Sequence, residues 1–187
     1  MNRSDDLCHV LTEDHHELRQ LLIELNHLSA SEPLWRSLAD LLIAEMTRHS
    51  VAKESYLYPA VRERVPGGRR LVDEYLAEHE KLERMGKILE RHDLPGAELS
   101  QLLARLDIEI RAHIRAEEEE LFPMLIEHFG AEELAALGRK AAAAKAEAEA
   151  SIRQRLPDRP VLNVIIATGA GLVERVRGHL RGRACPR

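Results

Sequence analysis

Four histidines recur at a fixed interval in this chain of 187 residues. His15 and His49 are separated by 34 residues, and His79 and His113 by the same number. Imidazole is a common ligand of transition metals, and a buried imidazole needs a partner for each ring nitrogen. Four buried histidines with carboxylates nearby meet that need together by binding metal. The spacing therefore predicts a metal site.

The histidines belong to a longer internal repeat. In segments 49–59 and 113–123, a histidine, an alanine, a glutamate, a leucine, an aromatic residue and a proline fall in register. Upstream, Asp14-His15 matches Glu78-His79. Two copies of a helical hairpin, packed about a pseudo-twofold axis, would place the four histidines at similar depth. We therefore expect them to face one another in the core.

Acidic residues follow two of these histidines by one helical turn. Glu117 comes four residues after His113, and Glu83 stands in the same relation to His79. Residues at this offset lie about 40° apart around a helix, so both carboxylates are candidate metal ligands. A mixed set of imidazoles and carboxylates suits iron, with zinc and manganese as alternatives. Glu120, seven residues after His113, lies on the same face.

The remaining histidines carry no comparable pattern. His16 points about 100° away from His15, which predicts a solvated side chain. The others are expected at the surface or at helix ends: His9, His27, His92, His128 and His179.

Ferritin-like carboxylate proteins are the nearest alternative, and they use a Glu-x-x-His motif on each of two helices. Here that spacing occurs at Glu13–His16 and Glu24–His27, but both pairs lie on the first predicted helix. The sequence therefore disfavours a ferritin-like site.

Apolar residues recur at helical spacing through most of the chain. They predict four long helices, at about 7–28, 34–65, 70–92 and 97–128. Pro59 and Pro123 are expected to kink the second and the fourth of them. Antiparallel helices with short connections form an up-down bundle, so we expect an all-α four-helix bundle over residues 1–130.

Residues 131–187 are expected to form a C-terminal helical extension and tail. The stretch from Glu132 to Arg155 is rich in alanine and charge, and its thin apolar stripe predicts a helix that packs loosely or projects. Residues 156–170 contain prolines and glycines typical of a linker, and 172–180 form a short amphipathic segment.

Charge and composition disfavour several classes of protein. A net charge of −5 argues against nucleic-acid binding, which usually requires a basic excess. No apolar run approaches the roughly 20 residues that a membrane helix needs, and the N-terminal residues do not resemble a secretory signal. Two cysteines provide no disulfide framework, so we expect a cytoplasmic protein.

In this order, the motifs resemble those of the hemerythrin-like (HHE cation-binding) family, in its bacterial single-domain form with a C-terminal extension. The resemblance covers residues 7–128. It rests on Asp14-His15, on His49 with its downstream Glu-x-x-Leu-Tyr-Pro, on Glu78-His79, and on His113-x-x-x-Glu117 followed by Leu-Phe-Pro. The resemblance implies a hemerythrin-like bundle with a non-haem di-iron centre, bridged by an oxo or hydroxo group. The implied ligands are His15, His49, His79 and His113, with Glu117 as a bridging carboxylate.

One position departs from the family pattern. The family places a bridging glutamate four residues after the second-helix histidine, where this chain has Lys53, with Glu54 next to it. Oxygen-carrying members use such a five-residue offset on their last helix, so Glu54 is a candidate ligand. We expect Lys53 to extend outward. Without this bridge the site would hold one metal, bind weakly or recruit Tyr56. Glu83 stands where oxygen carriers place a further histidine, so the ligand set does not match a carrier.

The resemblance implies a protein that reacts with or senses a small diatomic ligand or peroxide, in redox sensing or the stress response. One alternative is an enzyme that consumes peroxide or nitric oxide at the same centre. The other is a helical binding module with a degenerate metal site. The sequence leaves the choice between enzyme and sensor open.

Overall fold

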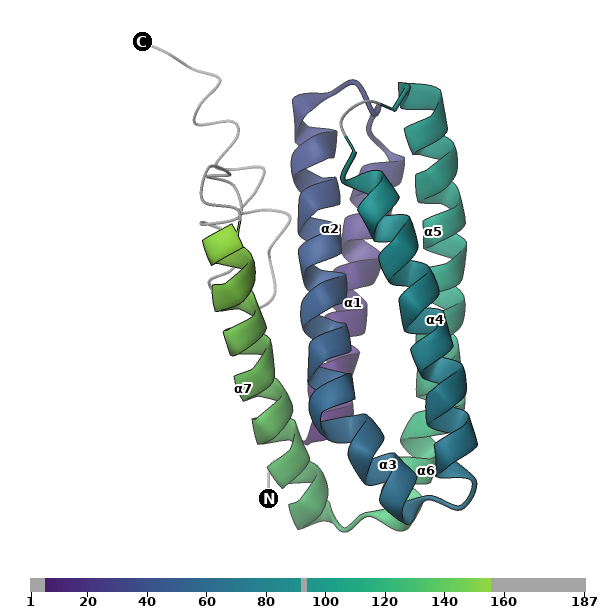
Figure 1. Ribbon diagram of the computed structural model, residues 1–187, viewed down its shortest axis with the longest axis vertical. Coiled ribbons are helices and arrows are strands. Elements are labelled where there is room, and N and C mark those ends of the chain that lie inside the picture. The colour runs from purple at the N-terminus through teal and green to yellow at the C-terminus, as the bar shows by residue number, and fades with distance from the viewer. Residues whose placement is uncertain (1–5, 92–93, 156–187) are drawn as a thin grey trace.

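The computed structural model describes residues 6–91 and 94–155, and every regular element within these ranges is helical. The elements are α1 (Leu7–Asn26), α2 (Pro33–Ala52), the π-helical turn η2 (Lys53–Leu57), α3 (Tyr58–Arg64), α4 (Gly68–Leu89), α5 (Gly96–Ala116), the π-helical turn η3 (Glu117–Leu121), α6 (Phe122–His128) and α7 (Ala131–Arg155). Helices α2 and α3 are continuous through η2, and α5 and α6 are continuous through η3. Together with α1 and α4 they form an antiparallel four-helix bundle, which confirms the predicted fold (Figure 1).

The core consists of two apolar clusters with the histidines between them. Leu22, Leu42 and Leu106 belong to one cluster, and Leu11 and Leu57 belong to the other. In each of the four long helices of the bundle (α1, α2 with α3, α4, and α5 with α6), the repeated histidine lies between residues of the two clusters. Burial of a leucine side chain stabilises a fold by about 1.5–3 kcal/mol. The apolar clusters therefore hold the polar centre in place from both ends.

The two prolines predicted to kink the bundle follow the two π-helical turns. A proline inside a regular helix removes one hydrogen bond, and its ring clashes with the carbonyl four residues before it. In each π turn, the residue before the proline donates its N–H to the carbonyl five residues back. This widens the helix by one inserted residue ahead of Pro59 and Pro123, so the helix continues. The insertion also changes which later residues face the core.

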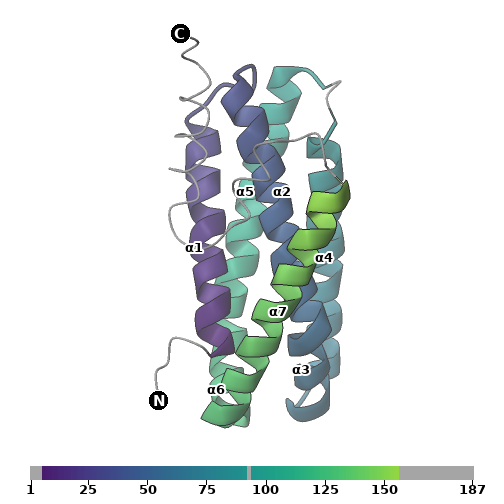
Figure 2. The ribbon, with the colours of Figure 1, turned by 90° about the vertical axis from the view of Figure 1, so that its left-hand side faces the viewer.

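Helix α7 lies along α1 and α2 on one side of the bundle (Figures 1 and 2). Leu134 and Ala141 are buried in the same apolar cluster as Leu57. The expectation of a loosely packed or projecting helix is therefore wrong for this part of α7. The linker and the amphipathic segment predicted at 156–170 and 172–180 lie outside the described residues.

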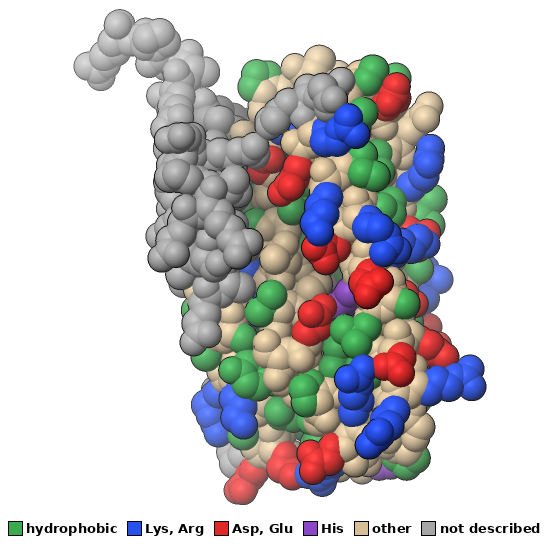
Figure 3. Space-filling view, in the orientation of Figure 1, with side chains coloured by type: hydrophobic (Ala, Val, Ile, Leu, Met, Phe, Trp, Pro, Cys, Tyr) green, Lys and Arg blue, Asp and Glu red, His purple; other side chains and the backbone are tan. Residues whose placement is uncertain are grey.

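The surface of the bundle carries charges of both signs. Figure 3 shows acidic and basic side chains interspersed with apolar ones over one face. On α4 several of them form pairs one turn apart, such as Arg70 with Glu74. Exposed pairs of this kind contribute only about 0.3–0.5 kcal/mol each. Among the described helices, none combines the length and the apolarity needed to cross a membrane.

The turn into α4 generates a stability prediction. Gly67 adopts a left-handed conformation with φ of 73°, and a Cβ atom on Gly68 would lie 2.1 Å from the Val61 carbonyl oxygen. Gly68→Ala is expected to lower the free energy of unfolding by about 1–3 kcal/mol, because the backbone must move apart.

Gly86→Ala is the matched control for this prediction. A Cβ atom there would meet Ile43 at an ordinary 3.9 Å, inside the same helix. Alanine should stabilise this position by about 0.5–1 kcal/mol. Urea unfolding of both variants checks the pair, and equal stability of Gly68→Ala and the parent protein would contradict the close approach.

Candidate metal centre

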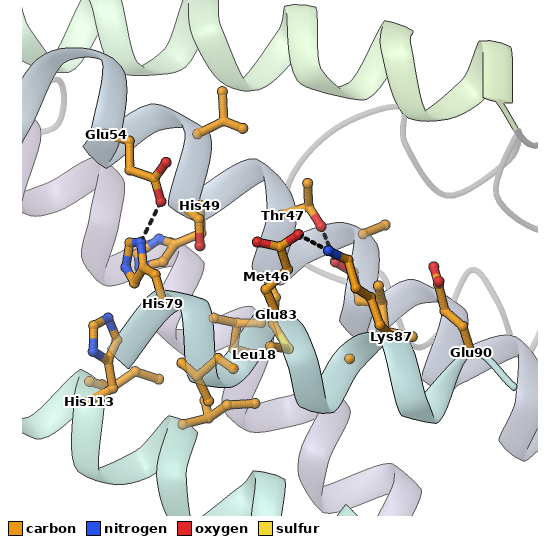
Figure 4. A pocket seen from close by; sticks show the side chains of 18 of the residues that line it. Leu18, Met46, Thr47, His49, Glu54, His79, Glu83, Lys87, Glu90 and His113 are labelled. Atoms are coloured by element: carbon orange, nitrogen blue, oxygen red, sulfur yellow. Dashed lines mark hydrogen bonds and ion pairs between the residues drawn. The ribbon is translucent and has the colours of Figure 1, made fainter. Parts of the chain in front are cut away.

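The four predicted histidines converge in the middle of the bundle, and all four are buried. The ring centroids of His15 and His49 are 5.0 Å apart, and those of His79 and His113 are 5.1 Å apart. Figure 4 shows His49, His79 and His113 arranged around a common space. We call His15 and His49 the first half-site, and His79 and His113 the second half-site. Each residue of the second lies 64 positions after its counterpart in the first.

The outer ring nitrogen of every histidine faces a carboxylate. The Nδ1 contacts join His15 to Glu118 at 2.9 Å, His49 to Asp14 at 3.1 Å, His79 to Glu54 at 2.7 Å and His113 to Glu78 at 2.6 Å. A carboxylate that accepts a proton from Nδ1 fixes the tautomer and directs the lone pair of Nε2 inward, as metal-binding histidines require. Both half-sites therefore have the same support, from carboxylates that are also 64 positions apart.

Three of the predicted carboxylates do not join the inward-facing groups. The Glu54 side chain is 44% exposed and is bonded to the outer nitrogen of His79. Glu83 is 64% exposed and pairs with a lysine one turn further on. Glu120 is also exposed. Of the predicted carboxylates, the structure places Glu117 at the centre of the histidine cluster.

Glu117 and Lys53 form an ion pair at this centre. Both side chains are 0% exposed, and Nζ of Lys53 lies 2.7 Å from Oε1 of Glu117. The expectation that Lys53 extends outward is therefore wrong. A buried ammonium requires a charged or polar partner, and the buried carboxylate supplies one. Each of the two residues begins a π-helical turn, and they are 64 positions apart like the other pairs.

The ion pair sets the charge state of the centre. Burial lowers the pKa of Lys53, and the Glu117 carboxylate opposes this change. Burial by itself would raise the pKa of Glu117, but the Lys53 ammonium and the imidazoles outweigh it and hold that pKa well below its usual range. Glu117 is therefore a carboxylate at neutral pH.

The first half-site has the donors for a cation. Nε2 of His15 lies 3.1 Å from Oε2 of Glu117, and Nε2 of His49 lies 3.5 Å from the same oxygen. Within the described residues, His49 Nε2 is buried without a hydrogen-bond partner. Burial lowers the pKa of His15, so its ring is neutral and carries one N–H for two facing carboxylates.

A cation resolves this arrangement, because it turns three converging lone pairs into three ligands. Among the described residues, His15, His49 and Glu117 form a group whose ligand atoms all lie within 4.8 Å of one another. Two histidines and one carboxylate are the ligand set of many non-haem iron(II) sites, which keep open positions for a small molecule. The first half-site therefore fits a metal ion such as iron.

The second half-site is filled by groups of the protein itself. Nε2 of His113 lies 2.8 Å from Nζ of Lys53, and Nε2 of His79 lies 3.0 Å from the hydroxyl of Tyr58. Burial raises the pKa of Tyr58 and lowers the pKa of His79 to about 4. The hydroxyl is therefore protonated and the imidazole neutral, so each inward nitrogen accepts a hydrogen bond. This half-site does not fit a second metal ion without rearrangement.

Tyr58 was not identified from the sequence. It follows His49 by nine residues, which on a regular helix places it about 180° away from that histidine. The π turn between them brings Tyr58 towards the core. Its counterpart Phe122 stacks on His15 with 5.7 Å between ring centroids. The aligned aromatic positions of the repeat were the one signal for this pair.

A cavity of about 550 Å³ leads to the centre between α2 and α4. Three of the four histidines line it, namely His49, His79 and His113. Its buried walls include Leu18 and Ile110, while the exposed Glu83 lies on its rim. The buried end combines apolar side chains with the three imidazoles, as small-molecule sites typically do, while charged residues such as Lys87 line the exposed part.

Comparison with known proteins shows the family of this bundle. The family model described as the hemerythrin HHE cation binding domain matches residues 6–125. The chain belongs to this family. Among curated proteins, none matches the chain.

The fold is also similar to that of a solved hemerythrin HHE cation-binding domain-containing protein from Mycobacterium kansasii. The TM-score is 0.72 at 22% sequence identity, and the match covers 91% of this chain and 98% of that one. At this identity the likeness shows the shared fold. In the chain described here, a member of the hemerythrin HHE family, the first half-site has the donors for a cation, and Lys53 occupies the second.

Helix α7 reaches the centre through Lys145. Its ammonium donates to Asp14, the carboxylate that supports His49. Asp14 is 4% exposed at its side chain. Burial by itself would raise the pKa of Asp14, but the contacts with His49 and Lys145 bring it below its ordinary value. The family match ends at residue 125, so a residue outside the matched region supports a candidate ligand.

Removal of this contact is expected to destabilise the protein. Lys145→Met keeps the apolar stem but leaves Asp14 buried with one partner fewer. The free energy of unfolding should fall by about 1–3 kcal/mol, which is the usual effect of losing one partner of a buried polar group. Lys140→Met on the exposed side of α7 is the control. Equal stability of both variants would show that α7 does not support the centre.

A buried glutamate one turn before His49 makes stability depend on pH. Burial raises the pKa of Glu45 to about 7, although the Arg48 charge lowers it. Because the folded state holds this proton more tightly than the unfolded chain, the contribution of Glu45 to stability is present below about pH 4.5. It is lost as the pH rises towards 7.

Glu45→Gln should remove this dependence. The variant is expected to match the parent protein near pH 4.5 and to exceed its stability at pH 8 by up to about 3 kcal/mol. Arg48 keeps a second carboxylate, Glu17, at 3.8 Å. Urea unfolding across this pH range measures the difference, and a difference that does not change with pH would contradict the buried proton.

Proposed function

We propose that this hemerythrin HHE protein binds iron through His15, His49 and Glu117 and uses it to react with or sense O2, NO or peroxide. The observation that carries the proposal is the convergence of two inward imidazole nitrogens and one carboxylate oxygen. Three protein ligands leave open positions on an iron ion, and a small oxidant requires such a position. Its place in the cytoplasm stays a prediction from the cysteine content.

The residues around this site prepare it for a cation. Asp14 and Glu118 hold the Nδ1 protons of His49 and His15, so both Nε2 lone pairs point inward. Glu117 contributes one negative charge in a site that excludes bulk water. When bound, iron would supply the exchange of electrons with a small oxidant.

The cavity supports a small partner. It reaches His49, and its buried wall there consists of apolar side chains such as Leu18 and Ile114. O2, NO and H2O2 are uncharged and small enough to enter such a space. At the buried end, a large charged substrate would lose its hydration and find few partners besides the histidines, since charged side chains such as Glu83 and Lys87 lie in the exposed part.

Metal uptake tests the proposal. His49→Ala removes one of the three ligands and is expected to weaken iron binding by more than the roughly 10–100-fold loss that follows removal of an outer partner. The measurement is metal content per chain after anaerobic loading with Fe²⁺ and removal of excess metal. Thermal unfolding with and without metal gives a second readout, because a bound ligand raises the stability of the folded state.

His27→Ala is the control, since His27 is an exposed histidine at the end of α1. It should load like the parent protein. Failure of the parent protein to take up iron, zinc or manganese would contradict the proposal. The centre would then be a polar core held together by Lys53 and Glu117, and the chain a helical binding module.

A further inference from the structure

The structure assigns one metal ion to this centre, in the first half-site, and assigns the place of a second cation to the Lys53 ammonium and the Tyr58 hydroxyl. The inference rests on the proposed function, because it concerns the number of metal ions in the same site. It differs from the di-iron centre that the family resemblance implies.

The first argument is the symmetry of the two half-sites. Histidines, outer carboxylates and π-helical turns all recur at positions 64 apart. Within this repeated framework, two of the groups that face the centre change their chemistry. Glu117 of the first half-site corresponds to Lys53, and Phe122 corresponds to Tyr58. The second half-site therefore has a cation and a hydroxyl donor where the first has a carboxylate and a ring without a polar atom.

The second argument is the count of hydrogens. In the second half-site both inward lone pairs accept a hydrogen bond, His113 from Lys53 and His79 from Tyr58. In the first half-site no hydroxyl or ammonium group of the described residues contacts His15 Nε2 or His49 Nε2. The two imidazole lone pairs that accept no hydrogen bond are thus both in the first half-site, on Nε2 of His15 and Nε2 of His49.

The third argument is charge. Oε1 of Glu117 contacts the Lys53 ammonium at 2.7 Å, and Oε2 faces His15 and His49. A metal ion on Oε2 leaves each carboxylate oxygen with one cation. A second divalent ion bound by His79, His113 and Oε1 would lie next to the Lys53 ammonium, which contacts both Oε1 and His113. In a buried site these two positive charges would repel each other strongly. It would also leave the lysine without its carboxylate partner.

Metal stoichiometry of the full chain tests the inference. The parent protein is loaded anaerobically with Fe²⁺ and, in a parallel sample, with Mn²⁺, and metal content per chain is measured after excess metal is removed. About one ion per chain is expected for each metal. The electron paramagnetic resonance spectrum of the Mn²⁺ sample should show the hyperfine pattern of an isolated ion rather than that of a coupled pair.

A double variant converts the second half-site into a copy of the first. Lys53→Glu with Tyr58→Phe gives both halves the same inward groups, and about two ions per chain are expected, with a coupled Mn²⁺ spectrum. Lys53→Met is the matched control, because it removes the ammonium without adding a ligand. It should remain at about one ion per chain.

Single histidine variants provide a test that does not depend on folding of the double variant. His15→Ala and His79→Ala remove residues at equivalent positions of the repeat. His15→Ala is expected to weaken Mn²⁺ binding at least about 100-fold, and His79→Ala less than about 10-fold. Equal losses in the two variants would overturn the inference.

The outcomes separate the inference from the proposed function. Two ions per chain in the parent protein would overturn the inference and leave metal binding intact. A folded double variant that stays at one ion would also overturn it, because Lys53 and Tyr58 would not then be what keeps the second ion out. No bound ion in the parent protein would overturn both.

Discussion

The buried ion pair between Lys53 and Glu117 is the interaction on which the centre depends. Both side chains are fully buried in the middle of a four-helix bundle, where an unpaired charge would be strongly unfavourable. The pair joins η2, between α2 and α3, to η3, between α5 and α6. It thus links the two halves of the repeat to each other. A metal on the other oxygen of Glu117 would extend the same network rather than replace it.

The four carboxylates that contact the Nδ1 atoms of the histidines hold the imidazole rings of this centre in place. Each imidazole is held by its outer nitrogen, which directs its other ring nitrogen inward. The apolar clusters on both sides keep Lys53 and Glu117 buried. Lys145 adds a contact from α7 to one of these carboxylates. Helix α7 is therefore part of the support of the centre.

Much of the fold and part of the site could be predicted from the sequence. Apolar spacing placed the four long helices of the bundle to within a few residues, because amphipathic helices with proline and glycine breaks leave a clear periodic signal. The alanine- and charge-rich composition placed α7. The repeat identified the four histidines, and the four-residue offset identified Glu117. The histidines lie on regular helix and Glu117 follows it directly, so spacing and direction are simply related up to these positions.

The errors and omissions cluster around the π turns and the charges. Lys53 was expected outside, because lysine is seldom buried without a partner, and its partner lies 64 residues away in the chain. Tyr58 follows an inserted residue, so regular helical geometry points it the wrong way. Lys145 contacts Asp14 across 131 positions of sequence, and no local pattern marks such a contact. For the two lysines a long-range ion pair determines the direction of the side chain, and for Tyr58 the inserted residue does.

The π turns also determine where these helices could lose a residue without turning the side chains of the centre. A helix with such a turn holds one residue more than a regular helix of the same span. Loss of one residue from 54–57 would allow regular helical hydrogen bonding and would place Tyr58 four residues after Lys53, about 40° round the helix. Lys53 and Tyr58 would then still share a face. The same loss within a stretch of regular helix would rotate every later residue by about 100°.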